Sequence, residues 1–199
     1  MKKNKNISLV PSLYEKYYNQ IEYSLDVKWI KFFRDVYKNS EVKIFNKNEK
    51  NKSDLIVLCG GNDLPIHSKK KSDLIRNNMN KLAFQYAIEK KIPIVGICLG
   101  ALFISKKFKS IIKLSKNHAN KVHKIYFLTQ KKNERKVNSY HNYIIAKLSD
   151  KFEALAVAKD NSIELFKHKK KSIYGLMWHP ERNRIFSKED KKLFRNICN

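Results

Sequence analysis

Cysteine, glycine and proline are all scarce in this sequence. The 199 residues contain three cysteines, five glycines and four prolines. No two cysteines form a C-x-x-C pair and their number is odd, so the sequence predicts neither a disulfide framework nor a cysteine-based zinc site. No glycine-, serine- or proline-rich linker divides the chain, whose length suits one domain with a sizeable core. We therefore expect a single domain over residues 1–199.

Long apolar runs are also missing. No stretch reaches the roughly 18 apolar residues that a membrane-spanning helix needs. The N-terminus "MKKNKNISLVPS" begins with basic residues but lacks the apolar segment of a signal peptide. Hydrophobic residues still make up 42% of the chain and aromatic residues 12%, which indicates a packed fold rather than disorder. We expect a soluble cytoplasmic protein with no membrane partner.

Acidic residues are few beside basic ones. The 18 Asp and Glu residues face 43 Lys and Arg residues, which gives a formal charge of +25. Such an excess attracts polyanions. The lysines are spread along the whole chain, however, so three interpretations stay open: a solvated surface with a compositional bias, a small anionic substrate, or, least favoured, nucleic acid.

Short apolar runs alternate with helical periodicities along the chain. This alternation predicts an α/β fold with a mostly parallel sheet, helices on both faces and some antiparallel additions. Helices are expected over 25–36, 72–90 and 187–197, and the second of these rests on the spacing of Ile75, Met79, Leu82 and Tyr86. The expected first-half strands are 7–10, 41–45, 54–59 and 92–97.

The stretch "PIVGICLGALF" (93–103) places Cys98 between two glycines where a strand should give way to a helix. A nucleophile at such an elbow needs small neighbours, because its backbone is strained and closely packed. The start of the helix also favours the reactive thiolate. The alternative is a small buried cysteine in a tight turn.

A candidate base follows near the C-terminus, in "YGLMWHPER" (174–182). His179 precedes Pro180 and Glu181, and a glutamate two residues away can orient an imidazole as the third member of a triad does. The alternative is a surface loop in which the two residues are neighbours by chance.

A third glycine-containing strand end is "VLCGGNDLP" (57–65). Gly60 and Gly61 would let a backbone N–H approach a substrate carbonyl and form half of an oxyanion hole, although a plain turn would also use glycines. All five glycines of the chain lie in these three stretches.

Together, "LCGGND", "GICLGA", "KVNSYHNY" and "YGLMWHPE" resemble, in this order and spacing, the class I glutamine amidotransferase-like superfamily, most closely its γ-glutamyl hydrolase (peptidase C26-like) branch. The resemblance runs from about residue 7 to 182. It implies a flavodoxin-like fold and cysteine-dependent hydrolysis of a γ-glutamyl amide through a glutamyl thioester, with release of glutamate. No cofactor or metal is implied.

The resemblance also implies roles for individual residues. Cys98 would be the nucleophile, His179 the base and Glu181 its orienting carboxylate. The N–H groups of Leu99 and of Gly60 or Gly61 would form the oxyanion hole. The substrate contacts would come from one loop, with the candidates Asn138, Ser139, Tyr140, His141, Asn142 and Tyr143. For His141, a loop or core histidine bonded to backbone is an equal alternative.

Three positions depart from the pattern of the family. Leu102 stands where a glutamine usually contacts the glutamyl substrate, Leu99 where the hydrolase branch often has arginine, and Met177 where glutamine is usual. These changes affect substrate recognition and leave the cysteine, histidine and glutamate in place.

A narrower resemblance concerns amidotransferase-like proteins of surface-polysaccharide pathways. The segments "IEYSLDVKW" (21–29) and "KNHANKVHKIYF" (116–127) carry it, and it implies a nucleotide-linked γ-glutamyl substrate. His118, His123 and nearby lysines would be candidate phosphate contacts, or else simply polar residues beside a strand. The chain shows no P-loop and no synthetase domain, so ammonia transfer would need a separate synthase partner. A non-enzymatic anion-binding protein is the least favoured hypothesis.

Overall fold

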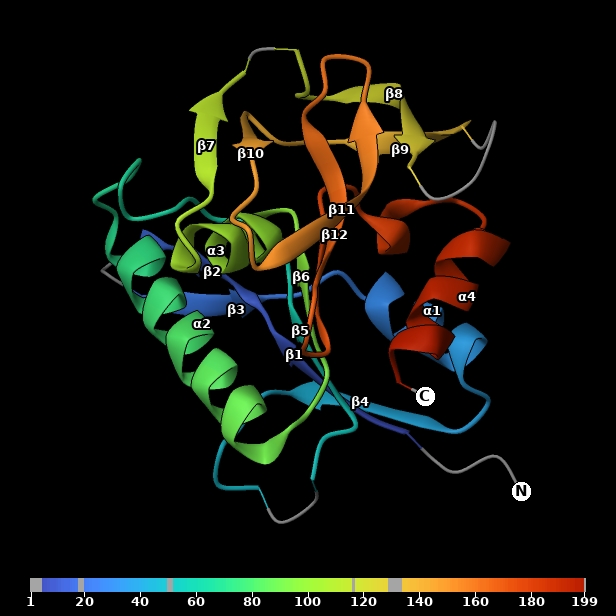
Figure 1. The fold of residues 1–199 in the computed structure, drawn as a ribbon. Helices are drawn as coiled ribbons and strands as arrows, with labels where there is room; N and C mark the ends of the chain where they lie inside the picture. The colour runs from blue at the N-terminus through green and yellow to red at the C-terminus, as the bar shows by residue number, and fades with distance from the viewer. Residues whose placement is uncertain (1–4, 18–19, 50–51, 116, 129–133, 199) are drawn as a thin grey trace.

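A computed structural model of the chain describes residues 5–17, 20–49, 52–115, 117–128 and 134–198. Its centre is a twisted sheet whose first part is parallel (Figure 1). The parallel strands, in spatial order, are β4 (Ser40–Ile44), β1 (Lys5–Val10), β5 (Leu55–Leu58), β6 (Ile94–Ile97) and β13 (Ile173–Leu176). Neighbouring strands of this part all pair in parallel, so their carboxyl ends meet along one edge.

The second part of the sheet is antiparallel. It continues from β13 through β12 (Ile163–His168), β11 (Phe152–Ala158), β8 (Lys121–Phe127) and β9 (Glu134–Ser139). A branch adds β10 (Tyr143–Lys147), which pairs with β12 and with β7 (Ile111–Leu114). The predicted fold class is confirmed, and the antiparallel additions are extensive.

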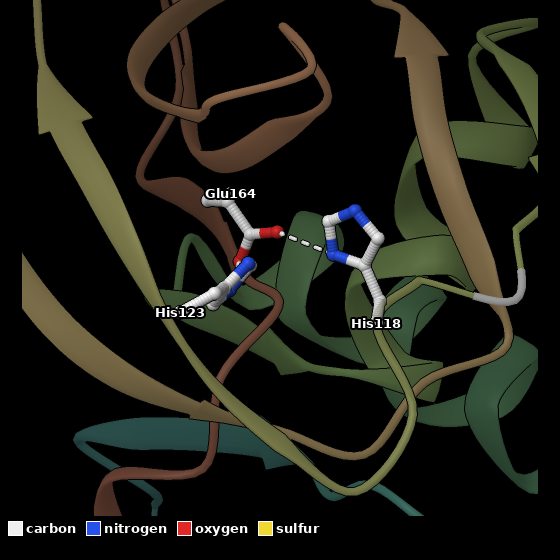
Figure 2. A group of neighbouring side chains, drawn as sticks. All are labelled: His118, His123 and Glu164. Carbon is white, nitrogen blue, oxygen red and sulfur yellow. Dashed lines mark ion pairs between the residues drawn. The ribbon is translucent and has the colours of Figure 1, made fainter.

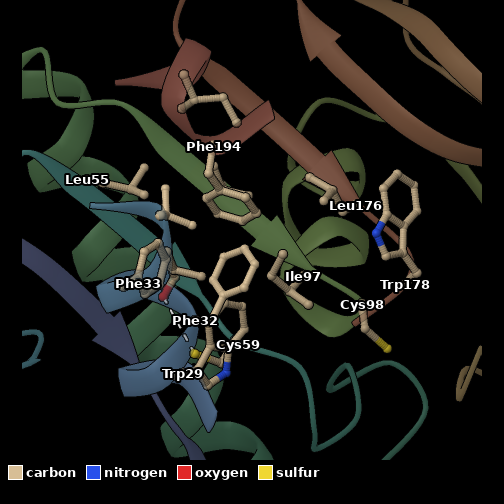
Figure 3. Packing of buried hydrophobic residues seen from close by; sticks show 14 of the residues in the cluster. Trp29, Phe32, Phe33, Leu55, Cys59, Ile97, Cys98, Leu176, Trp178 and Phe194 are labelled. Carbon is tan, nitrogen blue, oxygen red and sulfur yellow. Dashed lines mark hydrogen bonds between the residues drawn. The ribbon is translucent and has the colours of Figure 1, made fainter. Parts of the chain in front are cut away.

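Helices cover both faces of the sheet. The helices α1 (Lys28–Val36) and α4 (Lys188–Ile197) lie on one face, and α2 (Lys71–Lys90) and α3 (Leu99–Lys107) on the other (Figure 1). On the first face Trp29, Phe32 and Phe33 of α1 pack with Phe194 of α4 over the strands (Figure 3). On the second face Phe84 of α2 joins a separate buried cluster with residues of α3. Among the described residues, no helix is long and apolar enough to cross a membrane.

The helix predicted over 72–90 is present, but only Met79 and Tyr86 of the apolar stripe that predicted it pack against the core. Ile75 and Leu82 are 36% and 45% exposed. The buried face carries small, polar and aromatic residues instead, and it includes Arg76, which is fully buried. The Arg76 guanidinium donates hydrogen bonds to the carbonyl oxygens of Val10 (2.6 Å) and Cys59 (2.8 Å). Periodicity alone could not predict this polar attachment.

A short hairpin was not predicted at all. The strands β2 (Ser12–Glu15) and β3 (Ile21–Ser24) pair as a two-stranded sheet apart from the main one. The Asn62 side chain bonds both the N–H (2.7 Å) and the carbonyl (2.9 Å) of Leu13. The hairpin is thereby attached to the loop that follows β5, at the edge where the parallel strands end.

Candidate active site

Cys98 lies at a strained elbow between β6 and α3. Its φ of 49° and ψ of −103° fall where L-residues are rare, and its N–H donates to the Leu176 carbonyl at 2.7 Å. A Cβ atom on Gly96 would lie 2.3 Å from the Gly100 carbonyl carbon, and one on Gly100 would lie 2.1 Å from the Leu58 carbonyl oxygen. Both flanking positions therefore require glycine, and the expected strand-turn-helix arrangement is present.

His179 and Glu181 follow β13, with Glu181 in the short helix η2 (Pro180–Arg182). The His179 Nδ1 and Glu181 Oε1 atoms lie 2.7 Å apart, and both residues are buried. Burial alone would lower the pKa of His179, but its interactions with Cys98 and Glu181 outweigh burial and raise the pKa to about 9. The imidazole thus bonds the Glu181 carboxylate and lies near the Cys98 thiol, the neighbours that a base in a nucleophile–base–orienter arrangement would need.

Gly60 lies directly against this pair. A Cβ atom there would be 2.4 Å from Cε1 of His179 and 3.3 Å from Cβ of Cys98. The buried guanidinium of Arg76 holds the carbonyl of Cys59, the residue before Gly60. The ends of β5, β6 and β13, far apart in sequence, therefore converge at one point.

A cleft opens beside Cys98 and His179. Its other walls are formed by Gly61, Asn62, Asp63, Leu64, Leu99, Leu102, Tyr140, His141, Asn142, Tyr143 and Arg182. Four of the six candidate substrate contacts therefore face the cleft. The side chain of Leu102 lies on this wall, where the family usually has glutamine.

The other two candidate contacts have different neighbours. Asn138 accepts a hydrogen bond from the His179 N–H and donates one to the His179 carbonyl, both at 2.8 Å. The Ser139 hydroxyl, which is fully buried, bonds the carbonyl oxygen of His118. The side chains of these two residues therefore bond the backbone of His179 and of His118, and neither residue lines the cleft.

Arg182 is a cleft residue that no sequence motif singled out. Its guanidinium lies 4.7 Å from the centroid of the Tyr140 ring, and its side chain is 37% exposed. Its position directly after His-Pro-Glu was the available signal. It adds a positive charge to the cleft, and its Nε lies 3.8 Å from Oε1 of Glu181.

The candidate phosphate contacts His118 and His123 lie elsewhere. They do not line the Cys98 cleft, and both face the buried carboxylate of Glu164. Lys116, in the same loop, falls outside the described residues. A neighbouring carboxylate disfavours a bound phosphate, so these histidines give no support to the predicted phosphate site.

Comparison of the sequence with models of known families gives one match over most of the chain. The family "Glutamine amidotransferase class-I" matches residues 16–198. The chain therefore belongs to the class I glutamine amidotransferase family. The motif-based resemblance seen in the sequence is confirmed at this level.

Individual relatives are of two kinds, a hydrolase and a subunit of a synthase. The chain is 37% identical over 171 residues to the γ-glutamyl-CDP-amidate hydrolase of Campylobacter jejuni, a match that spans 83% of this chain and 84% of that protein. It is 28% identical over 152 residues to a glutamine-hydrolysing GMP synthase subunit of Methanocaldococcus jannaschii, over 72% of this chain and 73% of that protein.

A solved structure supports the fold. A glutamine amidotransferase of Thermotoga maritima superimposes with a TM-score of 0.66 at 17% identity, over 96% of this chain and 83% of that one. At this identity the likeness establishes the fold and carries no statement about substrate.

Proposed function

We propose that the protein is a cysteine-dependent hydrolase of a γ-glutamyl amide and that γ-glutamyl-CDP-amidate is its preferred substrate. The observation that carries the proposal is the convergence of Cys98, His179 and Glu181 beside one cleft. The similarity to the Campylobacter jejuni hydrolase supports the choice of substrate. The products would be glutamate and cytidine diphosphoramidate, the latter for modification of a surface polysaccharide.

In the proposed reaction the Cys98 thiolate attacks the γ-carbonyl carbon of the glutamyl group. The carbonyl oxygen becomes an oxyanion, which accepts hydrogen bonds from the Leu99 N–H and from an N–H of the Gly60-Gly61 turn. His179 donates its proton to the leaving nitrogen as the C–N bond breaks, which leaves a glutamyl thioester. His179 then takes a proton from water, the resulting hydroxide attacks the thioester, and glutamate leaves as the thiolate is restored.

Glu181 acts through His179 in this scheme. Its carboxylate accepts the Nδ1–H, fixes the tautomer that presents Nε2 to the reaction, and stabilises the imidazolium. Asn138 holds the backbone of His179 on both its N–H and its carbonyl. Both residues therefore position the base.

Recognition of the substrate is assigned to the remaining cleft residues. Arg182 is placed to meet a carboxylate or phosphate, and the backbone of Tyr140 to Tyr143 to meet the glutamyl α-groups. Leu102 cannot donate the hydrogen bond that glutamine usually supplies at its position, so another group must hold the glutamyl part of the substrate.

A second candidate function rests on the GMP synthase relatives. In that case the chain would be a glutaminase that delivers ammonia to a separate synthase. It would hydrolyse glutamine only when the synthase is present.

The test compares γ-glutamyl-CDP-amidate with glutamine and measures glutamate by mass spectrometry. The proposal predicts efficient release from the nucleotide substrate by the chain alone and little release from glutamine. Release from glutamine that appears only on adding a synthase would favour the second candidate. No release from either substrate, with or without a synthase, would contradict both.

A further inference from the structure

A second cluster of titratable side chains lies behind the cleft. Glu164 of β12 is fully buried, and its carboxylate lies between His118 and His123 (Figure 2). Its Oε1 is 3.5 Å from Nδ1 of His118, and its Oε2 is 3.5 Å from Nε2 of His123. A third histidine, His141, places Nε2 3.7 Å from the same Oε1. Segments widely separated in sequence thus bring three imidazoles to one carboxylate.

The inward-facing atoms of this cluster are all without hydrogen-bond partners among the described residues. They are Nδ1 of His118, Nε2 of His123, Nε2 of His141 and both carboxylate oxygens of Glu164, and all are buried. Five unpaired buried polar atoms in one place would be costly, since each loses its hydration without compensation. The arrangement requires something between them.

The outer nitrogens of two of the rings determine what their inner nitrogens present to Glu164. Nε2 of His118 lies 2.9 Å from the Asp160 carboxylate, and Nδ1 of His141 lies 2.9 Å from the Tyr143 carbonyl oxygen. Both outer partners are acceptors, so each ring donates its N–H outward. In a neutral imidazole the inner nitrogen then carries a lone pair directed at the carboxylate. Outer acceptors that fix the tautomer in this way are typical of histidines that bind metal.

We propose that His118, His123 and Glu164 bind a divalent transition-metal ion, with Zn²⁺ the preferred ion, and that His141 moves closer to supply the fourth ligand. Three imidazoles and a carboxylate are suitable ligands for zinc, and in a tetrahedral site with bonds of about 2.1 Å the ligand atoms lie about 3.4 Å apart. The observed separations are 3.5 Å and 3.7 Å from Oε1 of Glu164 to the nitrogens of His118 and His141, and 3.5 Å from Oε2 to the nitrogen of His123. The ligand atoms of His118, His123 and Glu164 all lie within 4.8 Å of one another.

The metal would act as a structural clamp. Four protein ligands fill a tetrahedral ion and leave no position for substrate. His141 lines the Cys98 cleft, and His118 and His123 line a separate surface hollow that gives the ion a route of entry. Because His141 belongs to the 140–143 loop, metal binding would hold this loop in place on the side away from the cleft. This proposal departs from the expectation of no metal site, because that expectation considered cysteine patterns and these ligands have no recognisable spacing.

A shared proton is the competing occupant. A hydrogen bond to Glu164 would raise the pKa of His118 and pair the two residues without a metal. The two occupants differ in one measurable quantity, the metal content of the folded chain.

The experiment measures metal per chain by inductively coupled plasma mass spectrometry on untagged full-length protein. Cys98→Ala is used as the background, because a cysteine–histidine pair can itself bind zinc. After dialysis against metal-free buffer we expect about one equivalent of Zn²⁺ per chain. After chelation and addition of Co²⁺ we expect the intense visible absorption of a tetrahedral site.

Matched variants in that background locate the ion. Glu164→Gln and His123→Ala should each lose most of the bound metal, while His67→Ala, a histidine outside the cluster, should retain it. Zn²⁺ should raise the melting temperature of the chelated background protein and leave that of Glu164→Gln unchanged. A substoichiometric metal content with no cobalt absorption in the background protein would overturn the proposal, as would full metal content in both cluster variants.

Discussion

A Cβ atom on Gly60 would lie 2.4 Å from Cε1 of His179. The glycine turn and the imidazole are therefore in direct contact, and the position of the base depends on the absence of a side chain at residue 60. A displaced imidazole would no longer lie between Cys98 and Glu181.

Gly60→Ala should lower cysteine-dependent glutamate release by about 10²-fold, the scale expected for a misplacement of about 1 Å at a reacting group. The effect should fall on kcat, since the added methyl group displaces the base. Steady-state kinetics and circular dichroism together check the result. Turnover equal to that of the native chain would show that the imidazole does not need this space.

Cysteine alkylation should be selective. Cys98 lies at a helix start beside His179, whereas burial raises the pKa of Cys59 to about 12. Iodoacetamide at neutral pH should therefore label Cys98 first, and Cys59 only after unfolding. Peptide mapping by mass spectrometry measures both. In His179→Ala the labelling of Cys98 should slow, and equal rates in the two proteins would contradict an activating contact.

The stability contributed by His179 should depend on pH with a definite sign. Its pKa rises from 6.5 to about 9 on folding, so its protonated form stabilises the fold fully below about pH 6.5. That contribution is lost as the pH rises through about 9. The difference in unfolding free energy between the native chain and His179→Gln, measured by urea titration, should shrink over this window. A difference that grew with pH would contradict the assignment.

Arg182→Ala should raise KM for the proposed substrate by about 10- to 100-fold, as expected for a lost hydrogen bond between charged groups. The guanidinium lies in the cleft over Tyr140, and its Nε lies 3.8 Å from Oε1 of Glu181, so kcat should also fall, but by a smaller factor than KM rises. Arg184→Ala, an exposed arginine two residues away, is the matched control. Equal KM values in the two variants would show that Arg182 does not contribute to substrate binding.

The central part of the fold and site could be predicted because it follows simple rules. Parallel strands bring their carboxyl ends to one edge, which places Cys98 after β6 and His179 after β13 on the same edge. Their pairing was expected from the resemblance to the amidotransferase family. Glycines mark such close contacts, and Gly60, Gly96 and Gly100 all proved to have no room for a side chain.

Other features depend on tertiary contacts that no local pattern encodes. Arg76 lies within a helix and is buried because two strand-end carbonyls accept its hydrogen bonds. Glu164 lies in a strand whose sequence, "IELFKH", does not distinguish a buried carboxylate from an exposed one. The hairpin β2–β3 has no glycine in its turn and is polar and aromatic, so it gave no hairpin signal.

The most direct test of the proposed chemistry is glutamate release from γ-glutamyl-CDP-amidate by Cys98→Ala, with Cys59→Ala as the control for loss of a buried cysteine. We expect Cys98→Ala to abolish release and a folded Cys59→Ala to retain it. In the native chain, rapid acid quenching and mass spectrometry should also detect a glutamyl adduct on the Cys98 peptide. Glutamate release that persists in Cys98→Ala would contradict the account.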